Sequence, residues 1–112
     1  MPKLNWTTVA AFALTLPGCE PSTSYGRPSV KVRKKMFACT GKQDDHFVCV
    51  TTAEDKQALL DNHPDTFFQT HYENSAAVLA RYTGDSELIE LMVERAWHRR
   101  ASKAQRNERE SQ

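Results

Sequence analysis

The chain has 112 residues, which is enough for one domain with a single hydrophobic core. Hydrophobic residues make up 39% of the sequence, and this content excludes an intrinsically disordered chain. Its 15 Lys and Arg against 14 Asp and Glu give a formal net charge of +1, so any role in nucleic-acid binding must depend on where the cations lie.

The N-terminal segment predicts an amphipathic helix that begins after the N-cap residue Asn5 and ends near Leu16, before Pro17-Gly18. Apolar residues recur there at helical spacing and should face the core: Trp6, Val9, Ala10, Ala13 and Leu14. The same segment up to Cys19 mimics a bacterial lipoprotein signal, but its weak basic end and polar interruptions favour the helix. No other segment of the sequence approaches the length that a membrane span requires.

The next part of the chain predicts an antiparallel meander. Residues 20–29 should be irregular, because Pro, Ser and Gly are frequent among them. Strands are expected over 30–32, 36–39 and 46–51, with a turn over 40–45. The connections are too short for parallel crossovers, so neighbouring strands should run antiparallel.

Three cysteines, Cys19, Cys39 and Cys49, form no CxxC pair and have no zinc-like spacing. They are typical of reduced, partly buried thiols in a cytosolic protein. A disulfide between Cys39 and Cys49 is the alternative, provided that the two face each other across neighbouring strands.

The second half predicts a helix over 51–62, since Thr51 and Glu54 have capping-box spacing. Two strands follow over 67–70 and 76–82, around a polar turn near 73–75. Asp85 or Ser86 should cap a last helix with a broad apolar stripe up to Trp97. After it the chain is polar and charged, which predicts a domain over residues 1–100 and a flexible tail over 101–112, either frayed helix or disordered.

Together these elements predict an α+β fold. We expect a two-layer sandwich in which the N- and C-terminal helices pack on one face of an antiparallel sheet. The opposite face of the sheet should be open to water.

Positive charge is concentrated between Gly26 and Lys42, where no acidic residue interrupts it. The cations of this segment are Arg27, Lys31, Arg33, Lys34, Lys35 and Lys42. The alternation in Val30-Lys31-Val32-Arg33 predicts a strand with one buried face, so Lys31, Arg33 and Lys35 should line up on the open face or near its edge. Such a face suits nucleic-acid phosphates, and a merely solvated charged face is the alternative. Cations of the tail could add a flexible arm: Arg99, Arg100, Lys103, Arg106 and Arg109.

Catalytic and metal-binding chemistry has little support in the sequence. The histidines are scattered, and GxSxG, HExxH and glycine-rich phosphate motifs are absent from the sequence. Two combinations, His71 with Glu73 and Asp44-Asp45 with His46, lack the spacing of a persuasive metal site. The sequence therefore predicts a non-enzymatic protein without a cofactor or metal.

A series of short motifs extends from about Leu4 to Arg99. They are Leu16-Pro17-Gly18, Ser24-Tyr25-Gly26-Arg27-Pro28, Val30-Lys31-Val32, Lys35-Met36-Phe37-Ala38, Ala58-Leu59-Leu60, His63-Pro64-Asp65-Thr66-Phe67-Phe68, His71-Tyr72, Val78-Leu79 and Glu94-Arg95-Ala96-Trp97. In their order and spacing they resemble the MmcQ/YjbR family. The resemblance implies a CyaY-like sandwich and binding of double-stranded DNA through a double wing. Independently of the resemblance, we expect a cytoplasmic monomer that does not associate with membranes.

Two positions depart from the family's pattern. Lys34 stands where the family usually has glycine, which adds charge, and Ala76-Ala77 replaces an apolar-aromatic pair, which removes bulk. The competing interpretation is a module that binds a protein or a small anionic ligand on the open sheet face, with Tyr25, Phe37 and Tyr72 as its aromatics.

Overall fold

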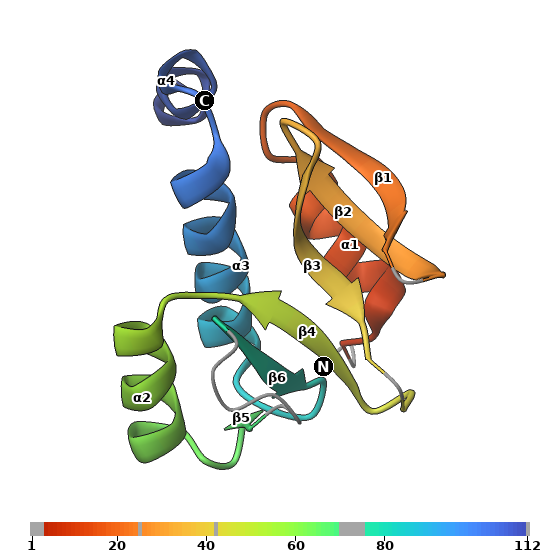
Figure 1. The fold of residues 1–112 in the computed structure, drawn as a ribbon, viewed down its shortest axis with the longest axis vertical. Coiled ribbons are helices and arrows are strands. Elements are labelled where there is room, and N and C mark those ends of the chain that lie inside the picture. The colour runs from red at the N-terminus through yellow and green to blue at the C-terminus, as the bar shows by residue number, and fades with distance from the viewer. Residues whose placement is uncertain (1–3, 25, 42, 70–75, 112) are drawn as a thin grey trace.

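The computed structural model describes residues 4–24, 26–41, 43–69 and 76–111. In chain order, its elements are α1 (Trp6–Leu14), β1 (Cys19–Ser24), β2 (Arg27–Val32), β3 (Lys35–Thr40), β4 (His46–Val50), α2 (Ala53–Asn62), β5 (Phe67–Phe68), β6 (Ala77–Arg81), α3 (Ser86–Arg100) and α4 (Lys103–Glu110) (Figure 1). Among these helices, none combines the length and the apolar character needed to cross a bilayer. The predicted turn near 73–75 lies outside the described residues.

The strands form one antiparallel sheet in the order β1-β2-β3-β4-β6-β5. Helix α1 packs against β1 and β2, α3 packs against β3 and β4, and the two helices contact each other (Figure 1). Helix α2 lies beside β5 and β6. This arrangement confirms the predicted α+β sandwich with the terminal helices on one face of the sheet.

Helix α1 begins where its capping residues predict. The Asn5 side chain accepts a hydrogen bond from the Thr8 backbone N–H at 2.9 Å, and the Thr8 hydroxyl accepts one from the Asn5 N–H. Val9 and Ala13 are buried as expected. Leu14 is 39% exposed, so its predicted place in the core is wrong: the helix ends at this residue, and Leu16 fills the core beyond it.

Strand β1 corrects the expectation of an irregular segment over 20–29. It is an edge strand paired with β2, and its Pro21 lies opposite Val30. Proline is tolerated at an edge because the missing N–H can fall on the unpaired side. Local composition favoured a loop here, whereas pairing with β2 supplies the hydrogen bonds of a strand.

The core lies between the helices and the sheet. Its fully buried large side chains include Trp97 on α3 together with Phe37, Phe47 and Phe67 on the strands. The Trp97 indole N–H donates to the Pro17 carbonyl oxygen at 2.9 Å. This bond satisfies both buried groups and ties α3 to the loop after α1.

The cysteine pairing that the sequence left open is excluded by the strand register. Cys39 lies opposite Val48, and Cys49 lies opposite Ala38. Adjacent residues of a strand point to opposite faces, so the Cys39 and Cys49 thiols are on different sides of the sheet. All three cysteines are free.

The segment after α3 is helical, which was one of the two conformations expected for it. Ala101 is buried, and Ser102 caps α4 through a reciprocal capping box with Gln105. The Gln105 side chain occupies the space that a side chain on Gly18 would fill. Helix α4 therefore docks beside the start of β1. The flexibility of residues 101–112 and the domain boundary at residue 100 remain predictions.

Candidate nucleic-acid interface

The hairpin of β2 and β3 ends in a turn made of two cations. Arg33 and Lys34 have φ values of 53° and 66°, in the left-handed region. A hairpin with a two-residue loop of type I′ needs positive φ at both central positions, and Asn-Gly is the usual solution. We call Arg33, Lys34 and Lys35 the hairpin tip. All three side chains are exposed.

The register of this hairpin corrects the predicted line of cations. Lys31 lies opposite Met36, and Lys35 lies opposite the buried Val32. Residues directly opposite each other share a face, so Lys31 and Lys35 start on different faces of the sheet. The cations thus surround the hairpin tip and do not form one line on the open face.

The remaining cations predicted from the segment are not part of the tip. Lys31 is partly buried within β2, where it lies opposite Glu20 of β1. Arg27 begins β2 and is separated from Arg33 by roughly 20 Å of strand, at about 3.3 Å per residue. Lys42 lies outside the described residues.

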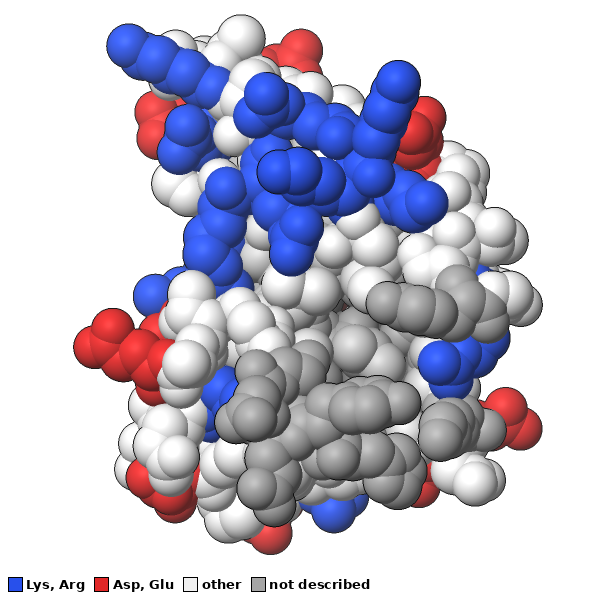
Figure 2. Space-filling model, in the orientation of Figure 1, with Lys and Arg blue, Asp and Glu red and all other residues white. Residues whose placement is uncertain are grey.

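Cations from the C-terminal part of the chain join the hairpin tip. Figure 2 shows Lys and Arg side chains gathered across the upper end of the molecule, over α4, the end of α3 and the β2–β3 turn. The sequence suggested a flexible arm from these residues. In the structure, the docking of Gln105 against Gly18 holds α4 near this end.

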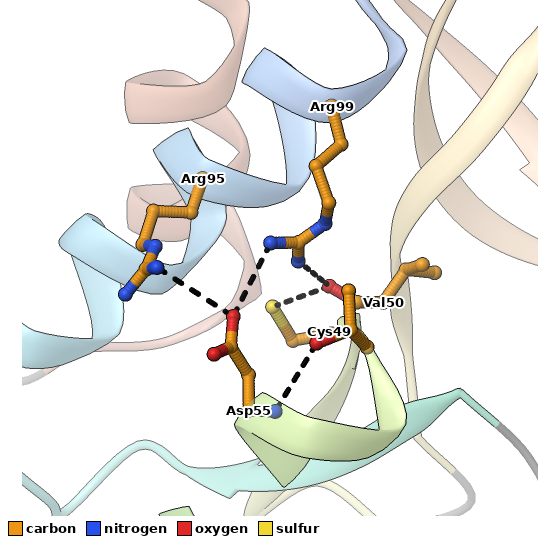
Figure 3. Close-up of polar contacts among 6 residues, drawn as sticks. Cys49, Val50, Asp55, Arg95 and Arg99 are labelled. Atoms are coloured by element: carbon orange, nitrogen blue, oxygen red, sulfur yellow. Dashed lines mark hydrogen bonds and ion pairs between the residues drawn. The ribbon is translucent and has the colours of Figure 1, made fainter.

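Three arginines of α3 and α4 pair with carboxylates. Arg99 lies 3.5 Å from the Asp55 carboxylate and donates to the Val50 carbonyl oxygen at 3.4 Å (Figure 3). Arg95 approaches the same carboxylate at 3.7 Å. Arg109 pairs with Glu94 at 2.9 Å. These pairs join α2 to α3 and α3 to α4, so Arg99 and Arg109 are less available to an external anion.

Six cations remain, and none of them forms an ion pair within the described part of the chain. They are Arg33, Lys34, Lys35, Arg100, Lys103 and Arg106. We call this set the basic end. Solvated Lys and Arg side chains of this kind can bind phosphate oxygens with little loss of internal contacts, and such contacts position a duplex without reading its sequence.

The described residues show no cluster of side chains typical of a catalytic site. The closest pair is His46 and Asp45, whose Nδ1 and Oδ1 atoms lie 2.7 Å apart, and this hydrogen bond lowers the pKa of the Asp45 carboxyl. Burial raises the pKa of the Cys19 and Cys49 thiols to about 12, which opposes thiolate formation. The described residues hold no group of three or more His, Cys, Asp and Glu that could bind a metal. His71 and Glu73 lie outside them.

Comparisons with known proteins address the fold and the family. A family model described as YjbR matches residues 14–99. The crystal structure of the Deinococcus radiodurans protein DR2400, described as a DUF419 domain, is similar with a TM-score of 0.74 and 18% identity, over 96% of this chain and 89% of that one. At this identity the likeness concerns the fold alone. Among curated proteins no match was found.

Proposed function

We propose, from the premise that this chain belongs to the YjbR family, that it is a non-enzymatic protein that binds double-stranded DNA through phosphate contacts of the basic end. The observation that supports the proposal is the gathering of six cations without ion pairs in the described residues, at one end of the molecule (Figure 2). They come from two segments far apart in sequence, the β2–β3 turn and the chain from the end of α3 into α4.

The chemistry of these side chains suits a phosphate backbone. Arg33, Lys34 and Lys35 project from a tight hairpin turn, so their charged groups can approach a duplex without obstruction from neighbouring strands. Arg100, Lys103 and Arg106 add cations from the helical side. Lys and Arg contacts of this kind release condensed counterions and give binding that is independent of sequence. We therefore expect similar affinities for unrelated duplexes of equal length.

The net charge of +1 limits the proposal to weak, salt-sensitive binding. Carboxylates elsewhere on the surface repel a duplex, so only the basic end should face it. The proposal keeps the expectation of a cytoplasmic monomer, which size-exclusion chromatography and cell fractionation would test.

Fluorescence anisotropy with a labelled duplex at low salt tests the proposal. Lys35→Gln and Arg27→Gln each remove one cation from the same hairpin, but Lys35 belongs to the basic end and Arg27 does not. We expect Lys35→Gln to weaken binding several-fold and to reduce the salt slope by about 0.9, while Arg27→Gln leaves both unchanged. Thermal unfolding of each variant controls for loss of structure.

Absence of wild-type binding at low salt would overturn the proposal. Equal losses in the two variants would remove the assignment to the basic end, because the duplex would then respond to total charge and not to its placement.

A further inference from the structure

A cavity of about 550 Å³ opens at the other end of the β2–β3 hairpin from its tip. The start of α1, the start of β2, the β3–β4 turn and the end of β6 meet around it. Its lining includes Trp6, Arg27, Gln43, Asp44 and Tyr82. Its volume is within the range of about 300–1,000 Å³ that is typical of small-molecule sites.

Arg27 is a partly buried cation in the wall of this cavity without a counter-ion among the described residues. It makes no hydrogen bond or ion pair with them. The carboxylate of Asp45, which is near in sequence to this wall, is engaged by His46 at 2.7 Å. Removing a guanidinium from water is unfavourable unless an anion or acceptor replaces the water. Asp44 lines the same cavity but forms no ion pair with Arg27, so the guanidinium is available to an anion supplied from outside the chain.

Aromatic rings form another part of the wall. Trp6 and Tyr82 both line the cavity, and the fully buried Phe47 contacts both of their rings. The Phe47 ring stacks on Tyr82 at 5.6 Å between centroids and contacts Trp6 at 6.4 Å. Both outer rings therefore pack against a residue of the core. A planar ring of a ligand can pack against such a surface.

We propose that this cavity binds a small ligand in which one phosphate or carboxylate is attached to a planar ring. The Arg27 guanidinium pairs with the anionic group, since its planar fork matches phosphate and carboxylate oxygens. Trp6 and Tyr82 contact the ring, and the Gln43 amide offers a donor and an acceptor to its polar edge. Asp44 lines the same cavity and disfavours a second anionic group on the ligand.

The site is separate from the basic end and does not rest on DNA binding. Arg27 lies at the start of β2, and the hairpin tip lies beyond its end. Its location also differs from the open sheet face on which the sequence had suggested an anionic ligand.

Titrations followed by amide NMR spectra test the proposal with four probes: adenosine monophosphate, benzoate, adenosine and inorganic phosphate. We expect adenosine monophosphate or benzoate to shift the amides of Trp6, Arg27 and Tyr82 at millimolar concentration and to leave those of Arg33 and Lys34 in place. The tighter of the two probes is then used with the variants. Adenosine and inorganic phosphate each lack one half of the ligand and should bind at least about tenfold more weakly.

Variants at matched positions of the hairpin complete the test. Arg27→Gln should weaken the binding of the tighter probe by about tenfold or more, whereas Lys35→Gln should leave it unchanged. Arg27→Lys keeps the charge and should bind with intermediate affinity, so it serves if Arg27→Gln fails to fold. The proposal is overturned if neither ring-bearing anion shifts the cavity amides, if adenosine binds as tightly as its monophosphate, or if the Arg27 variants bind as the wild type does.

Discussion

Arg33 and Lys34 adopt the left-handed backbone conformation, which is unfavourable for residues other than glycine. A residue other than glycine in the left-handed region is less stable by about 1–2 kcal/mol than one in the right-handed region, because its Cβ crowds the carbonyl oxygen. Both residues of the turn have positive φ. A glycine at position 34 would avoid this strain. The hairpin tip therefore carries a cation in a conformation that lowers the stability of the fold.

Lys34→Gly should stabilise the fold and weaken DNA binding. We expect a gain of about 1 kcal/mol and a rise in Tm of roughly 4 °C, since glycine adopts positive φ without strain. Thermal unfolding and anisotropy would measure the two effects. The matched control is Lys35→Gly, which places glycine inside strand β3 and should lower the stability by about 0.5–1 kcal/mol. A lower Tm for Lys34→Gly would contradict the assignment of strain to this turn.

Buried thiols and a tyrosine predict loss of stability at high pH. Burial raises the pKa of Cys49 from 9.0 and of Tyr82 from 10.0, each to about 12. Between these values the unfolded chain has lost protons that the folded chain keeps, so the free energy of unfolding should fall as the pH rises from about 9 to about 12. Urea unfolding across this range would measure it. Cys49→Ala should show a shallower fall, and an identical fall would argue against this thiol as a source.

At the scale of elements, α4 depends on a few local contacts. It has eight residues, too few for stability as an isolated helix. Its N-terminus is capped by Ser102, and Arg109 near its end pairs with Glu94 of α3. These contacts hold Lys103 and Arg106 beside the hairpin tip, so the basic end depends on the cap as well as on the charges.

Ser102→Ala should loosen α4 without unfolding the domain. The loss of an N-cap costs about 1 kcal/mol, which is a large share of the stability of so short a helix. We expect faster amide hydrogen exchange over Lys103–Glu110, unchanged exchange in α3, and weaker DNA binding. Ser111→Ala, at the other end of α4, is the control and should have little effect. Unchanged exchange in the Ser102 variant would show that packing alone holds the helix.

Helices could be predicted from the sequence because their hydrogen bonds and caps lie within one segment. Strand β1 and the hairpin register could not, because they depend on pairing between segments. The caps Asn5 and Asp85 and the apolar stripes behind them predicted α1 and α3, because a helix bonds within its own segment. Strand β1 was missed because its bonds come from β2. The cations of the hairpin were identified from composition. The spatial arrangement of these cations could not be predicted. The alternation from Val30 to Arg33 indicates a continuous strand, whereas in the structure Arg33 and Lys34 form a turn with positive φ that sets the register of the hairpin.

The assembly of the two candidate sites depends on tertiary contacts. The position of α4 results from Gln105 packing on Gly18, residues that no local pattern connects. Arg27 was assigned to phosphate binding from its neighbours in sequence, whereas in the structure it lines a cavity with Trp6 and Tyr82. In both cases the residue types can be identified in the sequence, but which residues come into contact depends on the tertiary structure.

At the scale of the whole molecule, a nearly neutral protein gathers six cations at one end, and none of the six forms an ion pair within the described residues. The arrangement in Figure 2 concentrates positive potential over α4 and the β2–β3 turn. Such an uneven distribution orients a protein toward a polyanion even when its net charge is small. The cavity beside Arg27 lies at the other end of the β2–β3 hairpin, so a small ligand and DNA could bind together.

The affinity of the wild-type protein for a duplex, measured across salt concentrations, tests the central claim most directly. If four or five of the six cations of the basic end contact phosphates, the logarithm of the association constant should fall with the logarithm of salt at a slope near −4, from about −0.9 per contact. Neutralising the hairpin tip should reduce that slope by about 2.7. A slope near zero, or no binding at low salt, would contradict the claim that this end of the protein binds DNA.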